Sequence, residues 1–550
     1  MFCTRFSKRL PAVLAGITLA VGCLTQPAMA NQPESSPGYF ALQPYKLPAK
    51  PTALDKKLLA AMEEYKVVGL SATVFRDNKV IWSGGYGWAD LETGRTVAPD
   101  TLFRMASLSK MVTATALMQL YDQGKFGLDD DISNYLGYQV RNPLYPTVKI
   151  TFRQLLTHTS SIIDSGAYDT IVESTPSLLQ ELDLKDILVP GGQYYSSATF
   201  ADYAPGSCFS YSNFGTGIAG SLVEKISGIP FDKYCSKFIF KPLNMDASFE
   251  PADIKNWKNI ATLYRPDEQL TNFRPTKDAY GGAKPAPTAI TAPLGSALGR
   301  SPAGGLRSST TDFSKFMQAH MNGGTYNRTR ILKADTADLM HSMQWFGYSM
   351  DGFYKQKGLN FHITDDLVPG KRLVGHSGEA YGLSSDAYYD PDSKFGVVFM
   401  MNGANLTDAN PYYSVENSVA KTLFDTFAPK GSNKPRQIKA KANAGFITVN
   451  DRKILLPVPV AITKSGKSQN LFLPAISTAD ALATGINQQG NTVTFTYGQK
   501  KAVLTVEQSW ITVNGTTLAL PQPPYKQNGQ ILVPVRELAD ALNINAKLSL

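Results

Sequence analysis

Apolar residues in the first 430 positions follow two periods, and together these predict a mixed domain. Alternation favours strands at 70–75 and 79–83, with the turn formers Asp77 and Asn78 between them. Helical spacing and two later apolar runs add further elements: helices at 107–123, 213–227, 313–321 and 413–427, and strands at 388–389 and 396–401. Strands at both ends with helices between them predict an α+β fold, in which helices and an all-helical region flank an antiparallel sheet.

The segment 431–550 repeats itself. The sequence of residues 447–450 recurs at 511–514, and that of residues 479–482 recurs at 539–542. Each unit has the pattern strand, proline-rich turn, strand, short helix. The segment contains no His and no Cys. We therefore predict a small β-rich module that serves as a binding unit or as a spacer and takes no part in catalysis. Turn formers and charges at 429–435 place its boundary, which leaves 31–430 as the main domain.

The first thirty residues have the pattern of a signal peptide. A basic start precedes the apolar run 10–24, and small residues at 28–30 offer a cleavage site. A membrane anchor is the alternative, but the apolar run is short for a bilayer span. A second alternative is a lipoprotein site at Cys23. We therefore expect the mature chain outside the cytoplasm, secreted or associated with the cell wall, without a membrane span.

Two cysteines, Cys208 and Cys235, are left after removal of the signal peptide. In an oxidising compartment they could form one disulfide. The alternative is two buried thiols.

Positive charge is concentrated at the C-terminal end. The net charge of the chain is +9, with +8 in 431–550, +3 in 1–30 and −2 in 31–430. An anionic partner would therefore bind the module, and for an exported protein a cell-wall polymer is expected rather than nucleic acid. The alternative is a solvated basic surface with no partner. In either case we expect removal of the module to spare turnover of small substrates.

The chemistry starts with Ser107 and Lys110, three residues apart on one face of the predicted helix 107–123. A serine hydroxyl needs a neighbour to take its proton, and a lysine serves if burial or nearby positive charge lowers its pKa. The spacing alone is weak evidence, because Ser418 and Lys421 have it too, and we interpret that second copy as chance.

Three further residues follow the first copy in order. Tyr211 and Asn213 lie at the start of helix 213–227, and His376 precedes Ser377 and Gly378 near the late strands. Taken singly they could be a core aromatic residue, a helix cap and a satisfied polar residue. Their occurrence together favours a catalytic site.

In these residues the chain resembles the serine β-lactamase and penicillin-binding-protein superfamily, in its class C β-lactamase and DD-peptidase branch. The resemblance covers roughly residues 55–428. It also includes these segments: 155–160, 205–206, 209–213, 303–306, 308–309, 346–348 and 375–378. It implies a β-lactamase/DD-peptidase-like domain without a metal or other cofactor.

The resemblance also implies roles. Ser107 is acylated, while Lys110 and Tyr211 shuttle its proton to the leaving group. Asn213 positions the substrate, and the N–H groups of Ser107 and Glu379 form the oxyanion hole. His158 has no catalytic counterpart in the family and is expected to be structural.

Three positions depart from the family pattern. His376, Ser377 and Gly378 stand where class C β-lactamases have Lys-Thr-Gly, which resembles DD-peptidases and D-stereospecific peptidases and disfavours efficient β-lactam hydrolysis. Glu379 is acidic where a small polar residue is common. If it faced the cleft it would disfavour a free carboxylate and favour a cation, and otherwise it points to solvent. Ser161 stands where glycine is usual.

These observations predict an exported serine hydrolase with an acyl-enzyme intermediate, acting on short peptides as a D-stereospecific peptidase or DD-carboxypeptidase-like enzyme. The alternatives are a carboxylesterase or weak β-lactamase of the same fold, and a non-catalytic cell-wall binding protein. Residues 162–204 are expected to form a loop over the cleft that sets specificity. The repeats of 431–550 resemble the copper amine oxidase N-terminal domain, which implies neither copper nor oxidase activity, since the segment has no metal-ligand cluster.

Overall fold

The structure is a computed structural model that describes residues 38–46, 48–174, 177–347, 356–368, 371–407, 411–429, 435–450, 452–465 and 468–550. The expected signal peptide 1–30, including Cys23, and most of the predicted linker lie outside the described residues. No helix in the described ranges combines the length and apolar character needed to cross a bilayer.

A nine-stranded antiparallel sheet forms the centre of the described chain. From one edge to the other its strands are β11 (Trp345–Phe346), β12 (Gln356–Lys357), β13 (His362–Thr364), β14 (Leu373–Ala380), β15 (Leu383–Asp390), β16 (Phe395–Met401), β2 (Gly69–Arg76), β3 (Lys79–Asp90) and β4 (Arg95–Thr96). The hairpin predicted from the alternation is confirmed. Asp77 and Asn78 both have positive φ, at 49° and 67°, the conformation of a tight two-residue hairpin turn.

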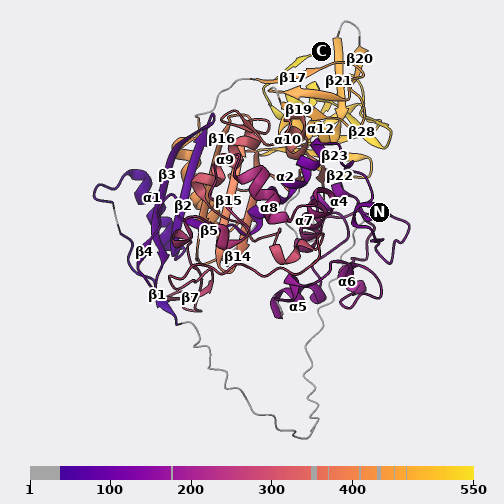
Figure 1. Cartoon of the computed structure of the whole chain (residues 1–550). Coiled ribbons are helices and arrows are strands. Elements are labelled where there is room, and N and C mark those ends of the chain that lie inside the picture. Colours follow the sequence, from indigo (N-terminus) through magenta and orange to yellow (C-terminus); the bar gives the residue numbers. More distant parts are fainter. Residues whose placement is uncertain are drawn as a thin grey trace, which may run out of the picture.

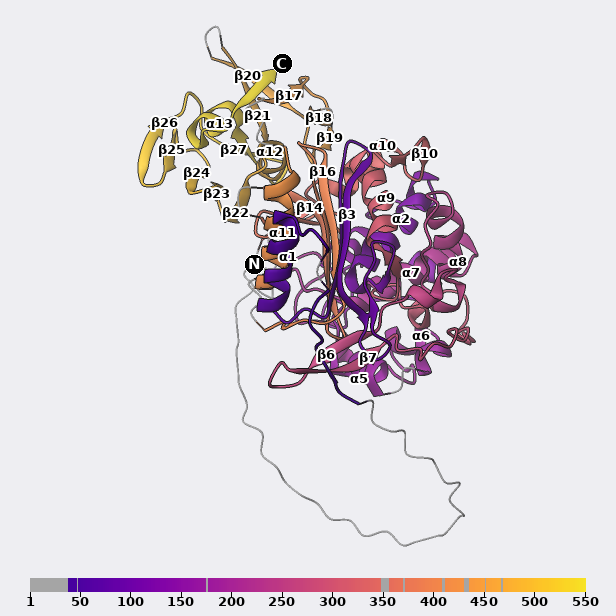
Figure 2. The ribbon, with the colours of Figure 1, turned by 90° about the vertical axis from the view of Figure 1, so that its left-hand side faces the viewer.

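Helices cover both faces of the sheet (Figures 1 and 2). One face carries α1 (Ala53–Glu64) and α11 (Ser414–Phe427), which contact each other. On the other side lie α2 (Ser109–Asp122), α7 (Asn213–Ser227) and α9 (Thr310–Met321). The remaining α-helices of this part are α3 (Ser133–Leu136), α4 (Phe152–Leu156), α5 (Gly166–Ser174), α6 (Lys185–Leu188), α8 (Phe231–Cys235) and α10 (Ala334–His341). The expected sheet with flanking helices and an all-helical region is confirmed.

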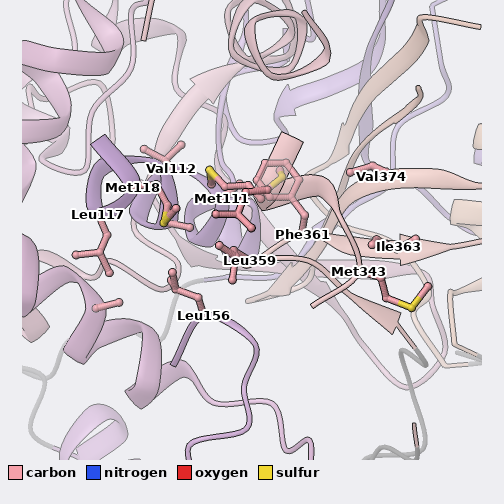
Figure 3. Packing of buried hydrophobic residues seen from close by; sticks show 14 of the residues in the cluster. Met111, Val112, Leu117, Met118, Leu156, Met343, Leu359, Phe361, Ile363 and Val374 are labelled. Carbon is pink, nitrogen blue, oxygen red and sulfur yellow. The ribbon is translucent and has the colours of Figure 1, made fainter. Parts of the chain in front are cut away.

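Helix α2 is buried on all sides from Ser109 to Leu120. Its side chains pack between the helical region and the segment leading into the sheet; Figure 3 shows Met111 and Met118 in this core together with Leu156 and Phe361. A helix that is tightly packed on all sides holds the residues of its first turn at a fixed position.

Two elements start several residues earlier than the apolar pattern predicted. Helix α9 begins at Thr310, because the Ser309 hydroxyl accepts the N–H of Asp312 (3.1 Å) and so caps a polar first turn. Strand β15 begins at Leu383, because Ser384 and Ser385 are buried and hydrogen-bonded. The Ser385 hydroxyl, for example, donates to the Met105 carbonyl (3.0 Å).

The C-terminal part is β-rich and carries the predicted repeat. Its elements are β17 (Arg436–Ala440), β18 (Phe446–Val449), β19 (Arg452–Leu455), β20 (Ala461–Ser465), β21 (Ser468–Pro474), α12 (Ala475–Leu482), β22 (Gly485–Gln489), β23 (Thr492–Tyr497), β24 (Lys500–Thr505), β25 (Trp510–Val513), β26 (Thr516–Ala519), β27 (Tyr525–Gln527), β28 (Gln530–Pro534), α13 (Val535–Leu542) and β29 (Ala546–Ser549). The two units pair with each other through β21 and β28, with Leu473 opposite Val533. Asn450 and Asn514 occupy equivalent turns, both at positive φ.

This module docks on the main domain through Asp480, which lies at the end of α12 and is buried. Its carboxylate accepts from the Arg452 guanidinium (2.9 Å) and from the Met343 N–H (3.1 Å), and the Arg372 guanidinium lies 3.5 Å away. The Gln356 amide of β12 donates to the Thr484 carbonyl (3.3 Å). The module therefore touches the sheet edge that leads to the site described below. This contact argues against the expectation that its removal spares turnover.

Candidate active site

Ser107 lies in a single 3₁₀ turn (Ala106–Leu108) immediately before α2, rather than inside the α-helix. It is half-buried, while the residues on both sides of it are buried. Strand β14 runs against it: a Cβ added at Gly378 would lie only 2.9 Å from the Ser107 nitrogen and 2.6 Å from the Ser385 Oγ. Glycine at 378 is therefore required by the close approach of the strand to the nucleophile.

Lys110 is fully buried, and its ammonium nitrogen is within hydrogen-bonding distance of three acceptors. Nζ lies 3.0 Å from the Ser107 Oγ, 2.7 Å from the Asn213 Oδ1 and 2.8 Å from the Ala303 carbonyl. Burial lowers the pKa of Lys110 to about 7, against the opposing charge of Asp164. Near neutral pH a substantial fraction of Lys110 is therefore the free amine that can take a proton from Ser107.

Asp164 is a residue of this network that the sequence analysis missed. Its carboxylate caps α7, accepting from the backbone N–H of Asn213 (2.9 Å) and of Phe214 (2.8 Å). It also accepts from the Asn213 side-chain amide (2.7 Å), which leaves the Asn213 Oδ1 directed at Lys110. Asp164 thus orients Asn213, and Asn213 in turn holds the Lys110 amine.

Replacing Asp164 with Asn is expected to slow acylation of Ser107 roughly 10- to 100-fold, because hydrogen bonds to a carboxylate are stronger than those to an amide. The acid limb of the pH profile should also move to lower pH, since Asp164 raises the pKa of Lys110. Both effects can be measured as the rate of labelling by a fluorescent fluorophosphonate between pH 5 and 9. Asp129→Asn, at an ion pair with Arg153 away from the site, is the control. An unchanged rate and acid limb in the Asp164 variant would contradict the assignment.

Tyr211 lies between Lys110 and His158. Its ring stacks on the His158 imidazole (centroids 4.6 Å apart), and the Lys110 Nζ lies 4.9 Å from its centroid. His158 accepts the N–H of Ser212 on Nδ1 (3.2 Å), and burial lowers its pKa well below the usual value, so the ring is neutral. His158 therefore fixes the segment that carries Tyr211, a structural role as the sequence analysis expected.

The motif His376-Ser377-Gly378 lies within β14. His376 and Gly378 lie on the sheet face of Ser107, and the His376 ring is 6.2 Å from that of Tyr211. Burial, together with nearby lysine ammonium groups, lowers the pKa of His376 well below the usual value, so this imidazole is neutral where a Lys-Thr-Gly motif places a cation.

The register places Ser377 and Glu379 on the opposite face of the sheet. Glu379 pairs with Ser384, whose hydroxyl donates to Glu416 of α11 (2.7 Å). The Glu379 side chain is exposed there. The contribution of Ser377 and Glu379 to the Ser107 side is therefore made by their backbone.

A second buried lysine, also missed in the sequence, borders the site. Lys357 on β12 is fully buried, with its Nζ 5.3 Å from the ring centroid of Phe209 and 5.8 Å from that of Tyr211. It pairs across the strands with His362, whose ring lies 3.8 Å from that of His376.

The second Ser-x-x-Lys copy has a different environment. Lys421 is exposed on α11 and forms an ion pair with Asp425. Among the described residues, Lys421 is bonded to Asp425 and not to Ser418, which agrees with the interpretation of this copy as chance.

The structure rules out the possible disulfide between Cys208 and Cys235, because Cys235 is a free, buried thiol. The segment of Cys208 contacts the first turn of α2 through Tyr211, whereas the helical segment after Cys235 contacts its last turn, where Gln119 donates to the Phe238 carbonyl (3.0 Å). These turns are separated by roughly 13 Å along the helix, beyond the reach of a disulfide.

Residues 162–204 are not an open loop. They contain α5 and α6, and apolar side chains such as Leu184 and Leu188 join the core. Ser161, just before them, has φ of 61°, a backbone conformation that glycine adopts with the least strain. The Ser161 hydroxyl accepts a hydrogen bond from the Asn142 side-chain amide (3.0 Å). This explains why glycine would suit the position and what stabilises serine there.

Comparisons with known proteins agree with this geometry. The Beta-lactamase family model matches residues 54–416, and the Copper amine oxidase N-terminal domain matches residues 465–549. A beta-lactamase of Yersinia enterocolitica is 25% identical over 64% of this chain and 86% of its own length. Esterase EstB of Burkholderia gladioli is 32% identical over 40% of this chain, a match that spans 55% of the esterase. The structure of a D-stereospecific amidohydrolase from Streptomyces sp. superposes with a TM-score of 0.50 at 24% identity, over 68% of this chain and 99% of that one. The chain belongs to the beta-lactamase family and is a serine hydrolase.

Proposed function

We propose that this hydrolase cleaves short peptides through an acyl-enzyme on Ser107, as a D-stereospecific peptidase or a DD-carboxypeptidase-like enzyme. The observation that carries the proposal is the Lys110 amine, buried, with a pKa of about 7 and 3.0 Å from the Ser107 Oγ. An amine in this state can act as a general base at neutral pH.

In the acylation step the Ser107 Oγ attacks the scissile carbonyl while its proton passes to Lys110 and on through Tyr211. The oxygen that becomes negative lies between the N–H groups of Ser107 and Glu379, which donate to it. Collapse of the intermediate breaks the C–N bond, and the shuttled proton goes to the leaving nitrogen. Water then attacks the acyl carbonyl, the C–O bond to Ser107 breaks, and the proton of the water passes through Tyr211 and Lys110 back to the Ser107 Oγ.

The edge of β14 supports a peptide substrate. Strand β13 pairs with β14 only at residues 373–375, so in the described chain no strand pairs with residues 376–380 on that side. An extended peptide can add to such an edge through main-chain hydrogen bonds, which places its carbonyl beside Ser107. An ester without a peptide backbone gains less from this edge.

The neutral His376 offers no charge to a free carboxylate, so it disfavours β-lactams and, within the proposed class, favours a D-stereospecific peptidase over a DD-carboxypeptidase-like enzyme. The D-residue at the cleaved bond is proposed from the likeness to the D-stereospecific amidohydrolase. The second candidate is a carboxylesterase, favoured by the 32% identity to Esterase EstB.

The test is a substrate panel on purified protein: D- and L-peptides with free or blocked termini, p-nitrophenyl esters and a chromogenic cephalosporin. We expect a fluorescent fluorophosphonate adduct that Ser107→Ala abolishes and Ser418→Ala leaves unchanged, with D-peptides as the best substrates. Better turnover of esters would favour the carboxylesterase. The absence of any adduct would favour a non-catalytic cell-wall binding protein.

We also propose that the chain is exported and that the module meets an anionic cell-wall polymer. The start of the sequence supports export. The module supports polymer binding, because the following basic side chains are exposed: Lys439, Lys441, Lys501, Lys526, Arg536 and Lys547.

A further inference from the structure

We propose that Lys357 is a positioning residue for acylation, whose buried ammonium group stabilises the negatively charged form of Tyr211 from β12. This inference rests on the proposed acylation of Ser107. It adds a residue outside every motif that led to the site.

The first support is geometric. Two ammonium groups lie against the Tyr211 ring, that of Lys110 at 4.9 Å and that of Lys357 at 5.8 Å from its centroid. A phenol that gives up its proton becomes an anion, and nearby cations favour that form. A cation beside the ring therefore raises the fraction of Tyr211 present as the phenolate, the form that can take the Ser107 proton from Lys110 and relay it.

The second support is burial. Lys357 has no exposed surface, and its Nζ lies 5.3 Å from the ring centroid of Phe209, which itself stacks on Trp345 (5.0 Å). A lysine is rarely buried so completely, because its charge loses hydration. In a low-dielectric surrounding its field at Tyr211 is stronger than that of a solvated lysine.

The third support is the neutrality of the other groups around Tyr211. The titratable side chains that face its ring are Lys110 from α2, Lys357 from β12, His158 after α4 and His376 from β14. Burial lowers the pKa of both imidazoles well below the usual value, and among charges the Lys357 ammonium contributes most to this. Asp164, the nearest carboxylate in the network, is engaged by α7 and Asn213. The Lys357 ammonium on β12, two strands away, thus supplies the positive charge that the neutral His376 on β14 lacks.

The test uses the full chain and the fluorophosphonate probe, with labelling rates measured from pH 6 to 10.5. We expect Lys357→Met to label roughly 10- to 100-fold more slowly at pH 7 and to regain most of the wild-type rate at high pH, so that its profile lies about one unit or more to the alkaline side. Lys357→Arg, which keeps the charge, should hold the profile in place. Lys453→Met is the matched control, since that lysine also lies over an aromatic ring (Phe446, 4.7 Å) but in the module.

A rate loss for Lys357→Met that is equal at all pH values, or no loss, would overturn the inference in favour of a packing role. If the methionine variant does not fold, Lys357→Gln replaces it and the same comparison decides. A wild-type chain that fails to label at all contradicts the proposed function instead, so the two failures are distinguishable.

Discussion

Lys110→Met is expected to lower the rate of Ser107 acylation roughly a thousandfold or more, because it removes the group that takes the proton from the nucleophile. In the wild-type chain the rate should rise with pH through about 7, the pKa to which burial lowers Lys110, since only the free amine is a base. The variant should lose this limb as well as the rate. Fluorophosphonate labelling across pH 5 to 9 measures both.

The matched control is Lys421→Met, which removes a lysine of the same sequence spacing whose ammonium is exposed and paired with Asp425. This variant should label like the wild type. Similar losses in the two variants would show that the labelling rate does not depend on Lys110 as a base, and circular dichroism excludes unfolding as the cause.

Asp480→Ala is expected to destabilise the protein by about 3–5 kcal/mol, the cost of leaving a buried guanidinium without its carboxylate. Asp480 lies between Arg452 and Arg372, and both guanidinium groups are largely buried. Because Arg372 also donates to the Thr484 carbonyl (2.8 Å), the lower end of this range is expected. Urea unfolding followed by circular dichroism measures the change.

The repeat supplies the control for this prediction. Asp540 occupies the position of Asp480 in the second unit, at the same place in α13, but it is exposed. Asp540→Ala should change the free energy of unfolding by less than about 0.5 kcal/mol. Equal losses at the two positions would mean that Asp480 acts within the repeat and not between the module and the main domain.

The sequence was most informative where local spacing carries the chemistry. Ser107 and Lys110 are three residues apart, and Tyr211 and Asn213 flank a helix start, so their proximity follows from short segments and a family pattern. Helix α7 was predicted with its observed bounds because Gly228, at φ of 72°, ends it.

The residues that were missed have no local signal. Asp164 follows two apolar residues, and only tertiary contact brings its carboxylate to the first turn of α7. Lys357 reaches Tyr211 because β12 joins the sheet edge beside His362, a pairing that no periodicity indicates. The contact made by Asp480 was equally hidden, because its repeat partner Asp540 has the same sequence neighbours and a different environment.

The burial of the imidazoles has a consequence for acid tolerance. All five histidines are buried, and burial lowers the pKa of each below its ordinary value: His158, His320, His341, His362 and His376. Below about pH 6.5 the imidazoles of the unfolded chain bind protons, whereas those of the folded chain stay neutral. Acidification therefore lowers the free energy of unfolding by about 1.4 kcal/mol per pH unit for each ring. Carboxyls with raised pKa, Asp386 and Glu416 foremost, oppose part of this because unfolding releases their protons. In moderately acidic surroundings, survival of the fold therefore limits this hydrolase as much as the protonation of its base.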